Sequence, residues 1–138
     1  MAGSHAPDAA ERHTAHLGAV FLGHLLQALD EARRGSNLTK QFAVTEKGEL
    51  VNGIGDPLPT RHDLLTGTQP DGRAYTDTAD HTCNNWTSNG AGSAQVGHSD
   101  RVGNGNQSWN SSHATTGCSQ RDLVAWGGVG LFYCFVAN

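Results

Sequence analysis

The segment from residue 83 to residue 134 constrains the fold more than any other part of the chain, because it is dominated by turn-forming residues. It contains the stretches CNNWTSNGAGSAQVGHSDR, SWNSSHATTGCSQ and GLFYCFVAN, which carry three cysteines together with Trp86 and Trp109. A stretch this rich in Gly, Asn and Ser has no helical or long strand pattern of its own. Cysteines and buried indoles must hold it together, which is typical of a small, loop-rich binding module.

Size and charge exclude several classes of protein. A chain of 138 residues is expected to form one globular unit. The net charge of −4 leaves no basic patch, so we expect no nucleic-acid partner. The apolar run from Leu17 to Leu29 is too short for a membrane span. Glu11 before this run and Asp30 after it argue against a secretion leader.

The chain divides into a helical segment, residues 1–36, and a domain of short strands and loops, residues 37–138. Apolar residues at helical spacing predict a helix over residues 8–34, although Gly18 and Gly23 weaken it. In the later part, the pattern predicts a hairpin at residues 42–51 and a turn at residues 69–72. It also predicts three strands, at residues 64–66, 82–87 and 131–136. The strand at 131–136 is apolar throughout and is therefore expected to be central.

An ordered set of short motifs resembles the C-type-lectin-like fold, in particular its endostatin-like and bacterial lectin-like branch. The motifs are LTGTQPDGR at 65–73, CNNWT at 83–87, SWN at 108–110, GCS at 117–119 and LFYCF at 131–135. The resemblance covers about residues 37–138. It implies an α+β domain with short antiparallel strands and long disulfide-tied loops, here preceded by the N-terminal helix.

The resemblance also implies how the cysteines pair. Cys83 is expected to bond Cys118, and Cys134 to pair with a cysteine nearer the N-terminus. Residues 1–82 contain no cysteine, so Cys134 is expected to be a free thiol. A disulfide and the family likeness together imply a secreted, periplasmic or cell-surface protein.

The loops of residues 84–117 are the candidate ligand surface. Amide side chains and an indole are suited to sugar recognition through hydrogen bonds and stacking. The candidate ligand-binding residues are His98, Asp100, Arg101, Asn104, Trp109, Asn110 and His113. His98 and Asp100 also have the chemistry of metal ligands. The simpler interpretation, which we favour, is a loop in which Asp100 and Arg101 pair with each other or with the backbone.

No cofactor is expected, with calcium as the alternative. Gln69-Pro70-Asp71 resembles the calcium-binding tripeptide of sugar-binding C-type lectins, but Trp109-Asn110-Ser111 lacks the carboxylate that would complete such a site. The tripeptide is interpreted as a turn. His13 and His16 lie three residues apart on the predicted helix and are interpreted as exposed histidines, so no metal site is predicted.

The sequence favours a non-enzymatic recognition module that binds a glycan or a protein surface. No G-x-S-x-G, H-E-x-x-H or P-loop motif is present. A second hypothesis is a structural domain that self-associates into a homo-oligomer through the apolar face of the N-terminal helix. A third is a metal-dependent enzyme.

Overall fold

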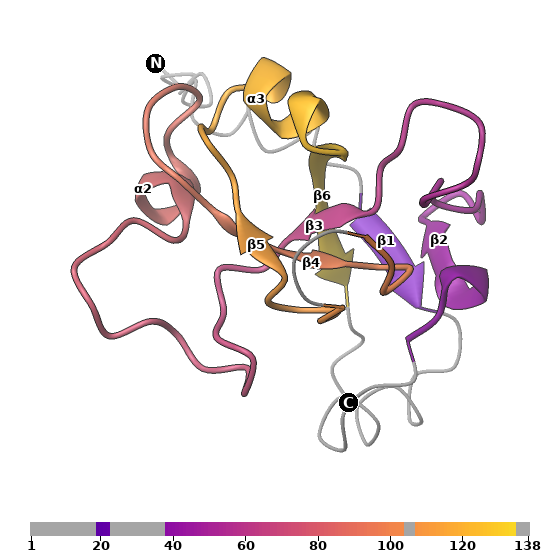
Figure 1. Cartoon of the computed structure of the whole chain (residues 1–138), viewed down its shortest axis with the longest axis horizontal. Helices are drawn as coiled ribbons and strands as arrows, with labels where there is room; N and C mark the ends of the chain where they lie inside the picture. The colour runs from indigo at the N-terminus through magenta and orange to yellow at the C-terminus, as the bar shows by residue number, and fades with distance from the viewer. Residues whose placement is uncertain (1–18, 23–37, 104–106, 135–138) are drawn as a thin grey trace, which may run out of the picture.

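A six-stranded mixed sheet forms the centre of the molecule (Figure 1). The computed structural model describes residues 38–103 and 107–134 and the backbone of residues 19–22. The strand order is β2-β1-β6-β3-β4-β5. The strands are β1 (Ala19–Leu22), β2 (Ala43–Thr45), β3 (Asp63–Leu65), β4 (Gln95–His98), β5 (His113–Ala114) and β6 (Gly128–Cys134). Three short helices accompany them: the 3-10 helix Lys40–Phe42, α2 (Cys83–Trp86) and α3 (Gln120–Ala125). The α+β class is thus confirmed.

β6 is the central strand, as its apolar sequence predicts. It runs parallel to both neighbours, β1 and β3. Leu131 lies opposite Leu64 of β3, and both are buried. The strand begins at Gly128, earlier than expected, and residues 135 and 136 lie outside the described part of the chain.

The predicted N-terminal helix is wrong where the structure describes it. Residues 19–22 form β1, which pairs with β2 on one side and with β6 on the other. The physical reason is visible in the sequence Ala-Val-Phe-Leu, an apolar run flanked by Gly18 and Gly23. Such a run suits a strand with neighbours on both sides, whereas glycine weakens a helix at each end. The rest of residues 8–34 lies outside the described residues.

The predicted hairpin is confirmed around β2. Val44 forms an antiparallel bridge with Leu50, and the Gly48 N–H donates to the Thr45 carbonyl at 2.9 Å. Gly48 has a φ of +79°, which glycine adopts without strain. The chain then returns to the sheet because the Val51 N–H donates to the Ala43 carbonyl at 2.8 Å.

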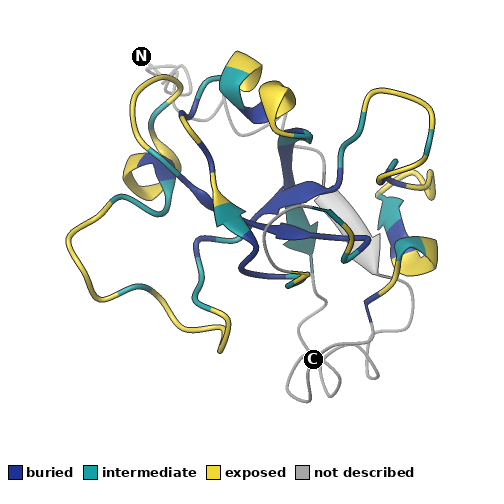
Figure 2. Cartoon of the chain, viewed as in Figure 1, coloured by how far each residue is buried: buried dark blue, intermediate teal, exposed yellow. Residues whose placement is uncertain are grey.

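The disulfide between Cys83 and Cys118 is confirmed, and Cys134 is a free cysteine. Both bonded cysteines are buried in one of two apolar clusters, together with Leu65, Ala94, Val96 and Leu123. The second cluster contains Ala43, Val51, Leu64 and Leu131. Figure 2 shows the buried residues concentrated in the sheet, with exposed loops around it. The disulfide therefore ties the outer loops to the core.

The strand expected at residues 82–87 is wrong, because this segment forms the turn α2. Its residues Cys83, Asn84, Asn85 and Trp86 have φ between 51° and 65°, the left-handed region. Two upstream side chains hold the turn: the Thr82 hydroxyl accepts from the Asn85 N–H, and the Asp80 carboxylate accepts from the Asn84 N–H at 2.9 Å. Local side-chain bonds to the backbone thus override the strand propensity of the sequence.

Candidate functional site

The candidate site begins at β3, where His62 and Asp63 precede the buried Leu64. Asp63 lies opposite His98 of β4 in the antiparallel register. Two residues earlier on β4, Val96 lies opposite His113 of β5. Alternate residues of a strand share a face, so the sheet brings Asp63 together with imidazoles from two other strands.

Three imidazoles surround the Asp63 carboxylate. The Nε2 atoms of His62 and His98 both lie 3.3 Å from Asp63 Oδ1. The Nε2 atom of His113 lies 3.4 Å from Oδ2. The Asp63 side chain is only 1% exposed, and neither of its oxygens has a hydrogen-bond partner. A carboxylate buried in this way is costly unless an opposite charge compensates it.

The Nδ1 atom of each of the three rings contacts an oxygen atom on the side away from Asp63. His62 Nδ1 lies 2.8 Å from Asp100 Oδ1, His98 Nδ1 lies 3.2 Å from Ser112 Oγ, and His113 Nδ1 lies 3.2 Å from the Ala114 carbonyl oxygen. A carboxylate and a carbonyl only accept hydrogen bonds, so the Nδ1 atoms of His62 and His113 carry protons. In the neutral ring, Nε2 then keeps its lone pair toward Asp63.

The carboxylates of the site stay ionised despite burial. Burial raises the pKa of Asp63, but the imidazoles of His113 and His98 outweigh it and lower the pKa overall. The pKa of His113 is raised, mainly by its contact with Asp63. Burial likewise raises the pKa of Asp100, and His62 together with two backbone N–H groups lowers it overall. The site therefore places two ionised carboxylates, those of Asp63 and Asp100, in contact with imidazole rings that can bind a proton or a cation.

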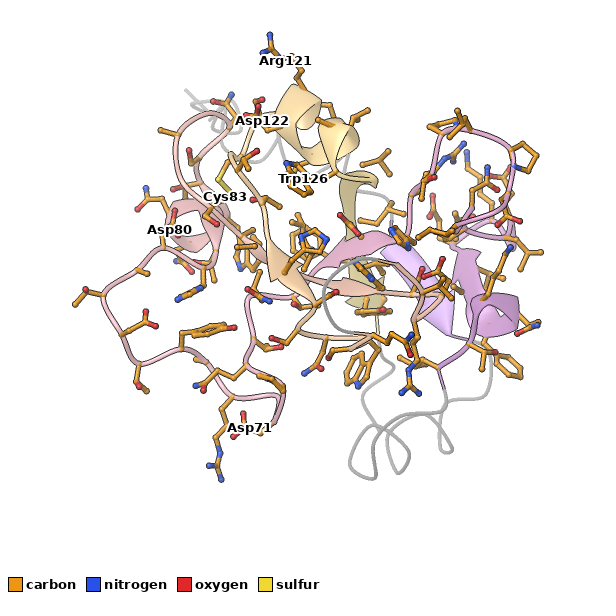
Figure 3. All side chains as sticks on the ribbon, viewed as in Figure 1. Asp71, Asp80, Cys83, Arg121, Asp122 and Trp126 are labelled. Carbon is orange, nitrogen blue, oxygen red and sulfur yellow. A yellow bond between two sulfur atoms is a disulfide. The ribbon has the colours of Figure 1, made fainter. Side chains whose placement is uncertain are left out.

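The rings of the site also pack on one another. His62 and His98 stack, with centroids 4.3 Å apart and 14° between their planes, whereas His113 meets His98 at 66°. Trp126 lies on the outer side, 5.7 Å from His113 between centroids. Its indole N–H donates to Thr116 Oγ1 at 3.0 Å, and Figure 3 shows it just below α3. His113, whose side chain is 23% exposed, and the exposed Trp126 thus lie at the outer edge of the site.

The structure brings some of the predicted ligand residues together and separates others. His98, Asp100 and His113 belong to the cluster around Asp63 and its supports. Arg101 and Trp109 are half-buried, and Asn104 lies outside the described residues. Asp100 and Arg101 bind the backbone, which is one of the two expected pairings: Asp100 accepts from the Val102 N–H at 3.1 Å, and Arg101 donates to the Gln107 carbonyl at 3.3 Å. The Asp100 side chain is buried and also bonds to His62 Nδ1 at 2.8 Å.

Asn110 is buried and joins two loops. Its side-chain amide donates to the Gln69 carbonyl at 3.0 Å, and its own carbonyl accepts from the Thr66 hydroxyl at 2.6 Å. The segment Gln69–Gly72 is a turn, in which the Gly72 N–H donates to the Gln69 carbonyl at 2.9 Å. The predicted turn is thereby confirmed, and Asn110 fastens it to the loop before β5.

Sequence reasoning missed His62 and Asp63. Their signal was an adjacent His-Asp pair directly before the apolar strand Leu64-Leu65, where a charged residue is unusual. Only the strand register shows that His98 and His113 lie next to this pair. Within residues 38–103 and 107–134, His62, Asp63 and His98 are the group with ligand atoms within 4.8 Å of one another.

Comparison with known proteins identifies no relative. No family model, curated protein or solved structure matches the chain. Among the described residues, no helix has the length and apolar character needed to cross a membrane.

Proposed function

We propose that the chain is a non-enzymatic recognition module of the C-type-lectin-like class that acts outside the cytoplasm and binds a glycan. The observation that carries the proposal is the turn α2, which displays Asn84, Asn85 and Trp86 on the surface beside the disulfide. Figure 3 shows Asp80 and Cys83 at the base of this turn.

The backbone of α2 is strained. Four consecutive residues other than glycine adopt the left-handed region, which costs about 1–2 kcal/mol at Cys83 and at Trp86 and less at the two asparagines between them. Such strain persists only where surrounding structure enforces it, and it is concentrated at ligand-binding sites. Here the disulfide at Cys83 and the bonds from Asp80 and Thr82 enforce it. This conformational strain has a function if the turn preorganises its exposed side chains for a ligand.

The displayed chemistry suits a sugar. An Asn amide donates and accepts, so it can bond adjacent hydroxyls, and an indole face stacks on a sugar ring. Trp86 is 40% exposed and also makes a T-shaped contact with Phe132, with centroids 5.0 Å apart. One part of the indole is thus fixed in the core, and another part remains accessible to a ligand.

The residues first proposed as ligand contacts have a supporting role in this scheme. Asp100 binds the Ile54 N–H at 2.8 Å as well as His62, and Asn110 binds the turn at Gln69. These buried polar groups hold the loops in one arrangement. A preorganised loop surface loses little conformational entropy when a ligand binds.

A glycan array tests the proposal, run with calcium and with a chelator. We expect binding that does not depend on calcium and that falls at least tenfold in the double variant N84A/N85A. The matched control is E46Q, an exposed substitution in the β2 hairpin, which should leave binding unchanged. Absence of glycan binding, or equal binding by N84A/N85A, would overturn the glycan proposal. A chain that self-associates in light scattering and binds no glycan would favour the structural-domain hypothesis instead.

A further inference from the structure

We propose that His62, Asp63, His98 and His113 form a binding site for a divalent transition metal ion of the zinc type. This site is separate from α2, and it does not depend on the glycan proposal. It would fasten β3, β4 and β5 together inside the domain. Asp63 supplies the negative charge, and three imidazoles supply nitrogen ligands.

The distances in the cluster fit ligands around one ion better than hydrogen bonds. A hydrogen bond from an imidazole to a carboxylate measures about 2.7–2.9 Å. The three contacts with Asp63 measure 3.3, 3.3 and 3.4 Å. Zinc lies about 2.0–2.1 Å from nitrogen and oxygen ligands, so two ligands of a tetrahedral ion are separated by about 3.3–3.4 Å. The three separations from Asp63 match that tetrahedral edge, and the ligand atoms of His62, Asp63 and His98 lie within 4.8 Å of one another, whereas His113 is not part of that close group.

Three buried polar atoms point to the same conclusion. Both oxygens of Asp63 and the Nε2 atom of His98 are buried without a hydrogen-bond partner. Buried polar groups are nearly always satisfied, so unsatisfied ones at a single point require an explanation. An ion between them satisfies the carboxylate and the ring nitrogen at once.

The oxygen atoms that contact the Nδ1 atoms of the three rings are arranged as they are around metal-binding histidines. A histidine that binds a metal usually donates its second N–H to a carboxylate, carbonyl or other acceptor, which fixes the ring and its tautomer. Asp100, Ser112 and the Ala114 carbonyl occupy this position behind His62, His98 and His113 respectively. All three rings therefore present Nε2 to the same carboxylate.

Ligand chemistry selects the type of ion. Calcium and magnesium prefer six or more oxygen ligands, whereas imidazole nitrogen suits zinc, nickel, copper and iron. A set of three imidazoles and one carboxylate in a largely buried place is typical of a closed, four-coordinate zinc site. The side chains of His62, Asp63 and His98 are at most 6% exposed, and His113 is 23% exposed. His113 thus lies on the side from which an ion would enter.

Binding requires one ring to turn. The planes of His62 and His98 are inclined by only 14°, and the lone pair of an imidazole nitrogen lies in the plane of its ring, so the two Nε2 lone pairs lie in stacked, nearly parallel planes and do not both point at one ion. His98 is the ring expected to turn, because its 3.2 Å contact with Ser112 is longer than the 2.8 Å bond between His62 and Asp100. The chemical shifts of the His98 ring should therefore change more than those of His62 on binding.

Zinc binding by the oxidised full chain provides the test. Other candidate ligands are first removed by substituting Cys134 with serine and the four N-terminal histidines, His5, His13, His16 and His24, with alanine. In this background, titration calorimetry with Zn²⁺ should give one ion per chain. Co²⁺ should give the intense visible absorption of a tetrahedral site, and Ca²⁺ should give no heat.

Single variants then assign the ligands. D63N, H98A and H113A should each weaken zinc binding at least tenfold, and D100N should weaken it through the orientation of His62. H81A is the matched control. His81 Nε2 lies 2.9 Å from Asp77 Oδ1, so it also pairs with a carboxylate, but this pair is not part of the proposed site. Circular dichroism identifies variants that fail to fold, and H113A, at the exposed edge, is expected to remain folded. Absence of zinc binding in the background protein, or unchanged affinity in folded H113A and D63N, would overturn the proposal.

Discussion

Removing the disulfide should destabilise the domain by an amount that follows from its position. We consider the variant C83A/C118A in a C134S background, which leaves no thiol to form another bond. The two cysteines are separated by 35 residues, and in the chain-entropy description a loop of that length contributes about 3.8 kcal/mol at 25 °C. Alanine avoids placing an unpaired hydroxyl in the apolar cluster that both cysteines occupy.

The expected loss is large compared with the stability of a typical domain. Domains of this size are stable by about 5–15 kcal/mol. With an unfolding entropy of about 2.1 cal/mol/K per residue over 138 residues, a loss of 3.8 kcal/mol lowers Tm by about 13 °C. Urea unfolding followed by tryptophan fluorescence measures the free energy, and calorimetry measures Tm. The single variant C134S is the control. A difference below about 1 kcal/mol between C134S and the disulfide-free variant would refute the argument that this bond holds the loops to the core.

Three further predictions concern side chains and turns. N110A should cost about 0.5–1.5 kcal/mol in urea unfolding, because it removes the hydrogen bond from the buried Asn110 amide to the Gln69 carbonyl. The pKa of Asp80 is lowered mainly by backbone N–H groups, so its stabilisation is present above about pH 4 and is lost as the pH falls through the folded pKa. The stability difference between wild type and D80N should therefore narrow below pH 4, and a constant difference would contradict this. G97A should prevent folding or lower the free energy of unfolding by more than about 3 kcal/mol, because the added Cβ would lie 1.8 Å from the Trp109 carbonyl oxygen. G90A is the control: its Cβ would meet nothing within 4 Å, so it should change the free energy of unfolding by less than about 0.5 kcal/mol.

Local sequence signals predicted the parts of the fold that depend on neighbouring residues. The hairpin around Gly48 and the turn at Gln69–Gly72 both formed, because proline fixes φ and glycine adopts a positive φ without strain. The apolar strand before Cys134 became the centre of the sheet, because a run without polar residues must be covered on both faces. The pairing of Cys83 with Cys118 came from the family likeness and is confirmed by the structure.

Two elements were predicted wrongly because long-range pairing or local side-chain bonds outweighed periodicity. Residues 19–22 match a helical repeat, but they pair with β2 and β6 as a strand. The segment around Cys83 has strand-like residues, but Asp80 and Thr82 bind its N–H groups and hold it in a left-handed turn. A short apolar run is ambiguous between helix and strand until its partners are known.

The sequence by itself determined the turns around Gly48 and at Gln69–Gly72 and the central place of the apolar strand that ends at Cys134, because these features depend on local composition. It also indicated His98, Asp100 and His113 as candidate ligand-binding residues. Only the tertiary structure decided that His98 and His113 lie against Asp63, because that depends on the register of β3 against β4 and of β4 against β5. A shift of one residue in either register would turn Asp63 or His113 to the opposite face of the sheet, and no pattern within a single strand specifies that alignment.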